Sequence, residues 1–159
     1  MSMIKIVLVV AFLLALTTGL VGQRMMGPGM MGHGMMRNAA RHRFAMTSGI
    51  PAPYGTLHDP LSLDQATIER GAEVYSQNCA ACHGASGTGD GVAGRNLSPP
   101  PADLTQLAQM PMAGSDSYLY WTIAEGGAPM GSAMPAYKGI LPRNDIWSVI
   151  VYLRARLSH

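Results

Sequence analysis

The feature that most constrains the fold of this chain is the five-residue run Cys-Ala-Ala-Cys-His at positions 79–83. Two thiols followed directly by an imidazole is the spacing used for covalent attachment of a c-type haem. In a helical turn the two sulfurs can each form a thioether with a haem vinyl group, while the ring of His83 turns under the iron as an axial ligand. The run therefore predicts a chain that folds around a haem, with Cys79 and Cys82 as the covalent attachment points.

Three other kinds of site use the same cysteine spacing. A structural zinc site needs four ligands, but the chain has no cysteine besides Cys79 and Cys82. A thioredoxin-like redox pair should follow a strand and open a helix, whereas the residues before Cys79 have a helical pattern. A plain disulfide is the third alternative, and we favour haem over all three. The remaining histidines are scattered along the chain, at His33, His42, His58 and His159.

Residues 1–23 are predicted to be a signal peptide or an uncleaved membrane anchor. Residues 6–22 carry no charge and are rich in Ile, Val, Leu and Phe. As a helix these 17 residues would span about 25 Å, close to the thickness of the hydrocarbon core of a bilayer. The length of this core and the lack of a clear Ala-x-Ala cleavage site favour the anchor. Either alternative takes the chain out of the cytoplasm.

A segment rich in Met and Gly follows, and we predict residues 24–58 to be a flexible linker because such Gly density makes the backbone costly to order. Thioethers are soft ligands that favour Cu(I), so the segment is also a candidate copper site. A tether without any ligand is the simpler alternative, and we favour it. The candidate copper ligands are Met25, Met26, Met30, Met31, Met35, Met36 and His33.

Residues 59–159 form the predicted haem domain. All nine acidic residues lie from Asp59 onward, against six Lys and Arg, whereas residues 1–58 contain basic residues and no acidic ones. This acidic excess predicts a mainly negative domain surface, which suits a basic docking patch on a redox partner protein. We expect no nucleic-acid partner.

Helices are predicted before and after the haem motif. A capping box over 62–65 starts the first near Ser62, and Gly71 on its apolar face, with Ile68, Ala72 and Tyr75, is expected to let another helix approach closely. A second helix covers 117–125, and a last one starts near Asn144. The inward candidates of the second are Tyr118, Trp121 and Ile123, and those of the last are Ile146, Trp147, Ile150, Val151, Leu153 and Leu157.

Two loops are expected to contact the haem. The Gly-rich run 84–91 is predicted to be a loop because its Gly density disfavours both helix and strand. The three prolines 99–101 fix an extended segment. A proline carbonyl there could accept the Nδ1 proton of His83 and orient its ring. Trp121 and Arg95 are candidates for hydrogen bonds to haem propionates, although packing and a solvated charge explain them more simply.

The loop 128–137 contains two methionines that could bind the iron opposite His83. Met134 is the better candidate because Pro135 biases it toward extended backbone and stiffens the segment that must hold it. Met130 is the alternative ligand. A thioether at this position favours Fe(II) and occupies the site where oxygen or peroxide would bind.

Residues 62–157 resemble a bacterial monohaem class I cytochrome c. The resemblance rests on the helix with Gly71 and Tyr75, the run 79–83, the Pro-rich loop, the Met-Pro-Ala-Tyr segment 134–137 and the terminal helix with Trp147. It implies an all-α fold around one covalent haem c, with Cys79 and Cys82 as attachment points and His83 and Met134 as axial ligands. Because such haems are attached in the periplasm, it also implies a domain on the periplasmic side, anchored or soluble.

The resemblance implies an electron-transfer protein without catalytic residues of its own. The main hypothesis is a one-electron carrier of a periplasmic or respiratory chain, whose partners are redox proteins or a membrane oxidase or dehydrogenase. The first alternative is the membrane-anchored haem subunit of a larger oxidase or dehydrogenase complex. The second is an open-iron haem enzyme or sensor, which requires that neither Met130 nor Met134 binds the iron.

Overall fold

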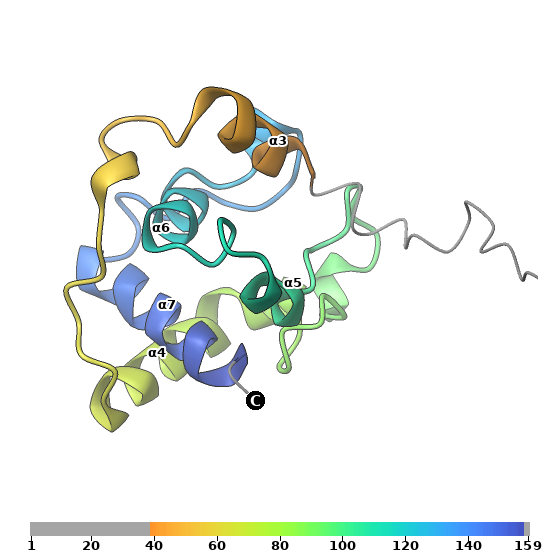
Figure 1. Cartoon of the computed structure of the whole chain (residues 1–159). Helices are drawn as coiled ribbons and strands as arrows, with labels where there is room; N and C mark the ends of the chain where they lie inside the picture. The colour runs from red at the N-terminus through yellow and green to blue at the C-terminus, as the bar shows by residue number, and fades with distance from the viewer. Residues whose placement is uncertain (1–38, 158–159) are drawn as a thin grey trace, which may run out of the picture. The chain divides into compact units, whose positions relative to one another are not determined.

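The computed structural model describes residues 39–157, and the regular elements of this part are helical, as the sequence predicts (Figure 1). Within it, no helix combines the length and apolar character needed to cross a membrane. The predicted signal or anchor segment and the candidate copper ligands lie outside the described residues. The elements are α3 (Ala39–Ser48), η1 (Tyr54–Thr56), α4 (Gln65–Asn78), α5 (Ala80–His83), η2 (Val92–Gly94), η3 (Leu104–Gln109), α6 (Asp116–Glu125), η4 (Ala128–Met130) and α7 (Arg143–Leu157).

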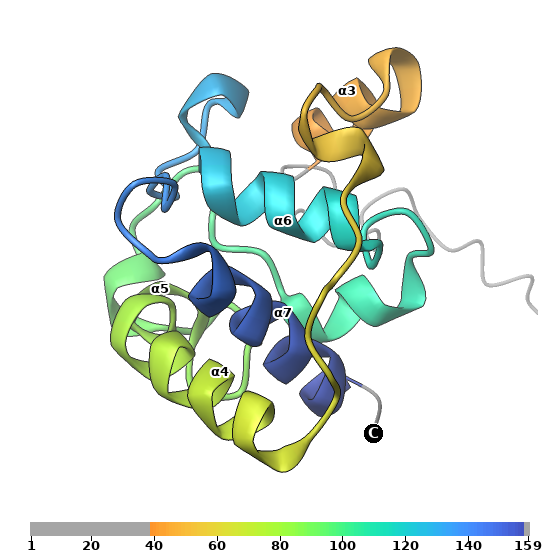
Figure 2. The same ribbon diagram turned by 90° about the vertical axis from the view of Figure 1, so that its left-hand side faces the viewer.

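The helices α4 and α7 pack side by side at the base of the domain (Figure 2). Gly71 makes this possible, because a Cβ built there would overlap the Ser148 carbonyl and lie 2.7 Å from Cβ of Tyr152, both on α7. The expected close approach at Gly71 is confirmed. On the outside of the crossing, the guanidinium of Arg70 holds both carboxylate oxygens of Asp145, at 2.9 and 2.6 Å.

The start of α4 differs from the predicted capping box. The N-cap is Asp64, whose carboxylate accepts the amide proton of Thr67 at 2.8 Å, and the first helical residue is Gln65. Ser62 is exposed and precedes the helix. A carboxylate next to the positive end of the helix dipole is a stronger acceptor than a hydroxyl, which explains why Asp64 takes the role assigned to Ser62.

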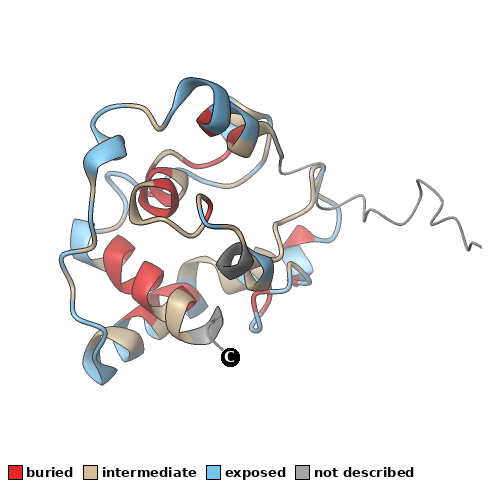
Figure 3. Cartoon of the chain, viewed as in Figure 1, coloured by how far each residue is buried: buried red, intermediate tan, exposed pale blue. Residues whose placement is uncertain are grey.

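The helix α6 is buried on almost all sides (Figure 3). Leu119, Tyr120, Ile123 and Ala124 join a core cluster with residues of α4 and α7. The opposite side of α6 belongs to a second cluster, in which Tyr118 and Trp121 meet α3. The predicted inward residues are therefore buried, and a second covered face adds to them. The predicted inward residues of α7 whose burial is described are buried as well. They are Ile146, Trp147, Ile150, Val151 and Leu153.

The prediction of a flexible linker over residues 24–58 does not hold from residue 39 onward. Residues 39–48 form α3, residues 54–56 form η1, and Ala45 of α3 is buried against α6. Ala and Arg are good helix formers, and Ala45 and Arg41 lie on one side of α3 at a spacing of four residues. The compact domain therefore begins upstream of the predicted boundary at residue 59.

Candidate haem site

The haem motif lies at a break between two helices. Cys79 ends α4, where its amide donates to the Tyr75 carbonyl at 2.8 Å, and its own carbonyl accepts the amide of His83 at 2.9 Å as α5 begins. The single turn of α5 thus presents both thiols and the imidazole from one compact unit. This is the local geometry that the spacing of the motif predicts.

Both thiols of the motif are half-buried, and they form no disulfide with each other. Burial, together with the neighbouring Cys82, raises the pKa of Cys79 to about 11. A reactive redox cysteine requires a lowered pKa, so this environment suits a thiol destined for a thioether better than a thioredoxin-like nucleophile.

The ring of His83 is half-buried and oriented by the backbone. Its Nδ1 lies 3.0 Å from the carbonyl oxygen of Ala102. A carbonyl can only accept, so Nδ1 is the donor and the lone pair of Nε2 is left for a metal ion. Burial lowers the pKa of His83, and the bond to Ala102 opposes that shift.

The acceptor differs from the prediction by one residue. A carbonyl of Pro99, Pro100 or Pro101 was expected, whereas the bond goes to Ala102 directly after them. The Gly-rich loop explains this placement: the amide of Gly89 donates to the His83 carbonyl at 2.8 Å, and a Cβ built on Gly89 would lie 2.8 Å from the Pro101 carbonyl oxygen. The Gly-rich loop and the proline segment therefore lie in close contact, with the Pro101 carbonyl against Gly89. The next carbonyl, that of Ala102, is the one that meets His83.

A strap, residues 128–137, carries both candidate methionines and folds back on the end of α6. The amide of Gly127 donates to the Met134 carbonyl at 2.8 Å, and the amide of Tyr137 donates to the Ile123 carbonyl at 3.1 Å. The hydroxyl of Tyr137 reaches across to the carbonyl of Asn78, at 2.6 Å. Because Asn78 immediately precedes Cys79, the strap is tied directly to the helix that carries the haem motif.

The two methionines of the strap lie in different surroundings. Met134 packs, half-buried, against the same core cluster as Cys79 and Ala80. Met130 packs against the second cluster, to which Trp121 belongs. The structure thus brings Met134, and not Met130, to the cluster that also contacts the haem motif.

The donor set fits a covalent haem. Two thiols, an imidazole with one nitrogen already bonded, and a thioether against a shared apolar core are the groups that such a cofactor requires. A further hydrogen bond, from the buried Tyr75 hydroxyl to the Gly84 carbonyl at 2.7 Å, fixes the residue after His83 to α4. Sequence reasoning missed this bond, although Tyr75 lies on the predicted apolar face.

The two candidate propionate partners lie in contrasting places. Trp121 is buried in the second cluster, with the guanidinium carbon of Arg41 at 4.2 Å from its ring centroid. Arg95 is exposed after η2. Their roles toward haem stay predictions.

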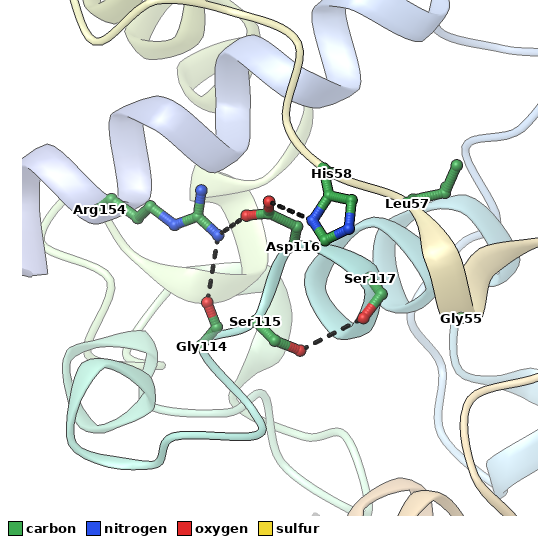
Figure 4. A pocket seen from close by; sticks show the side chains of 8 residues that line it. All are labelled: Gly55, Leu57, His58, Gly114, Ser115, Asp116, Ser117 and Arg154. Atoms are coloured by element: carbon green, nitrogen blue, oxygen red, sulfur yellow. Dashed lines mark hydrogen bonds and ion pairs between the residues drawn. The ribbon is translucent and has the colours of Figure 1, made fainter.

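A hollow of about 380 Å³ lies apart from the haem motif, between α6, α7 and the segment after η1 (Figure 4). Its polar groups are engaged with one another: the Arg154 guanidinium pairs with Asp116 and donates to the Gly114 carbonyl at 3.2 Å. His58 Nδ1 lies 3.9 Å from Asp116 Oδ2. We assign no chemistry to this hollow. The lining residues are Gly55, Leu57, His58, Gly114, Ser115, Asp116, Ser117 and Arg154.

Comparison by sequence finds a matching family and a relative of this chain. The model of the family described as cytochrome C oxidase, cbb3-type, subunit III matches residues 66–153. The Cbb3-type cytochrome c oxidase subunit CcoP of Azospirillum brasilense is 35% identical over 92 residues, which are 58% of this chain and 29% of that protein. The chain thus covers less than a third of this relative.

A solved structure shows a similar fold. A chain of the reducing HAO-like protein complex of Kuenenia stuttgartiensis matches with a TM-score of 0.51 and 22% identity. The match covers 72% of this chain and 54% of that one. At this identity, the likeness concerns the fold alone.

Proposed function

The chain belongs to the family of cytochrome C oxidase, cbb3-type, subunit III, and on this premise we propose that it is the haem-carrying electron-transfer subunit of a membrane oxidase complex. It is a c-type cytochrome domain protein, and haem c is its cofactor. Of the two electron-transfer hypotheses, the complex subunit has better support than the freely diffusing carrier, because the CcoP relative is by name an oxidase subunit.

In this proposal Cys79 and Cys82 would hold one haem covalently, and His83 and Met134 would ligate its iron. The observation that carries the proposal is the bond between His83 Nδ1 and the Ala102 carbonyl at 3.0 Å, since it fixes the tautomer that a metal-binding imidazole needs. Met134 is preferred to Met130 because it packs on the same core cluster as Cys79.

The bound haem supplies one-electron chemistry, since its iron alternates between Fe(II) and Fe(III). The protein's own residues orient the ligands and limit their movement. The Nδ1 of His83 donates to the Ala102 carbonyl, and the Tyr137 hydroxyl fixes the strap by donating to the Asn78 carbonyl. Little rearrangement is then needed when the iron changes charge, which suits rapid transfer to a partner.

The proposed location is the periplasmic side of the cytoplasmic membrane, and the proposed partners are the other redox subunits of the oxidase. Membranes solubilised in detergent test this assignment. We expect the full-length holoprotein to co-purify with a terminal oxidase activity. Recovery of all the haem protein as a monomer in the soluble periplasmic fraction would contradict the subunit and favour the free carrier.

The ligand assignment is tested on the full-length holoprotein with Met134→Leu and, as the matched control, Met130→Leu. We expect the ferric Met-to-iron charge-transfer band to vanish in the first variant and to persist in the second, with covalent haem present by mass spectrometry in both. Loss of the band only in Met130→Leu would reverse the assignment. A wild-type protein without the band would favour the open-iron alternative.

A further inference from the structure

The segment upstream of the haem motif holds the same end of α6 from which the strap 128–137 departs. α3 and η1 precede the residues that the family model matches. Even so, Arg41 Nη2 on α3 donates to the Gly126 carbonyl, and the Tyr54 hydroxyl on η1 donates to the Glu125 carboxylate. Two independent side chains therefore bond to Glu125 and Gly126, at the end of α6 just before the strap.

Arg41 is a buried charged residue in α3, where an apolar residue would be expected if the helix only covered the core. Its side chain is buried, with 7% exposure, over the ring of Trp121 at 4.2 Å. Its Nη1 is also buried, and within the described part of the chain it has no hydrogen-bond partner. Burying a charge so incompletely bonded is unfavourable, and an apolar residue would cover Trp121 at lower cost. What the guanidinium adds is the directional bond to Gly126.

Gly126 connects this bond to the strap. Its φ is +64°, and a Cβ built there would lie 2.5 Å from the carbonyl carbon of Pro135, so the strap backbone rests directly against it. The next residue, Gly127, donates to the Met134 carbonyl at 2.8 Å. A shift of the peptide at 126 would therefore move the backbone at the Met134 carbonyl and at Pro135, directly after it.

We propose that Arg41 is a positioning residue for the sixth iron ligand: through the Gly126 carbonyl it locks the α6 end of the strap, and Tyr54 supports it through Glu125. The inference rests on the proposed function, in which Met134 is that ligand. It gives α3 a role beyond covering the core, since release of Arg41 would let the strap detach more often from the iron.

Imidazole binding to the ferric full-length holoprotein tests the proposal, because added imidazole competes with Met134 for the sixth position. The variant is Arg41→Ala, and Arg43→Ala is the matched control, since Arg43 is exposed on the same helix. Losing a charge-assisted buried hydrogen bond should raise the apparent imidazole affinity about tenfold or more in Arg41→Ala. We expect a smaller rise in Tyr54→Phe and none in Arg43→Ala.

The outcomes separate this inference from the proposed function. Wild-type imidazole affinity and an unchanged ferric Met-to-iron band in Arg41→Ala would overturn the positioning role and leave Met134 as the ligand. If the wild-type protein lacks the band, the ligand assignment fails and the positioning role fails with it. Should Arg41→Ala lose haem or helical signal, Arg41→Lys and Tyr54→Phe decide instead, and wild-type affinity in both would overturn the proposal.

Discussion

Replacing Gly71 by Ala tests whether the close crossing of α4 and α7 requires a glycine at this position. An interior helical Gly normally gains about 1 kcal/mol of stability when changed to Ala. Here the new Cβ would overlap the Ser148 carbonyl and lie 2.7 Å from Cβ of Tyr152. Because neither atom can move aside by a change of rotamer, the helices must separate, at the upper end of the overpacking cost, about 3 kcal/mol.

The difference between these two effects is a net destabilisation of about 2 kcal/mol. For a domain of this size the melting temperature should fall by roughly 8 °C. The assay is denaturant and thermal unfolding of the full-length holoprotein, followed by far-UV circular dichroism. Ser76→Ala and Ser76→Gly, at an exposed position of the same helix, measure the propensity difference alone. Wild-type or higher stability in Gly71→Ala would refute the argument, because propensity would then be the dominant effect.

Two further changes test the contacts around the site. Tyr75→Phe removes the buried bond to the Gly84 carbonyl and should lower the free energy of unfolding by about 1–2 kcal/mol, measured by denaturant titration, and an unchanged value would contradict a formed bond. Hydrogen bonds from Lys138, and also from Tyr54, lower the pKa of Glu125, so its stabilisation is present above its unfolded pKa and is lost as pH falls through the folded pKa. Glu125→Gln should therefore be less stable than wild type at neutral pH but not in acid, and a difference that persists at low pH would count against this assignment.

The chemistry of the site could be predicted from short spacings along the chain. The run 79–83 places two thiols and an imidazole within about one helical turn, and the structure keeps them in that unit because α4 ends at Cys79 and α5 begins there. The apolar faces of α4 and α7 were also predictable, since a period of 3.6 residues identifies one buried side. Gly71 was predictable for the same reason, as a costly residue on an apolar face.

The acceptor for His83 and the N-cap of α4 could be predicted only approximately. Each depends on which of several neighbouring groups is nearest, and that is decided by tertiary packing. The carbonyl of Ala102 replaces that of a proline because the Gly-rich loop occupies the space beside Pro101. Asp64 replaces Ser62 because two capping residues lie within the same three positions, and the helix dipole favours the charged one.

The helix α3 could not be predicted because its face is defined by its partner. Its apolar side is short, and the residue that fixes it to α6 is an arginine, which sequence patterns assign to solvent. The complementary signal was present in α6, where Tyr118 and Trp121 extend the apolar surface beyond the side that α7 can cover. A helix that is apolar nearly all round requires a second covering element.

Because α3 covers α6 and bonds to Gly126, residues upstream of the haem motif also contact the end of α6 from which the strap departs. With His83 and Met134 as the proposed iron ligands, the strength of the thioether bond would depend on how firmly the strap is held when the iron changes charge. The strap is held at one end by Tyr137 and Asn78, within the matched domain, and at the other end through Gly126 by Arg41, from upstream of it. The proposed ligands therefore lie in short motifs of the sequence, whereas the proposed tightness of ligation also depends on a segment whose composition suggests only a tether.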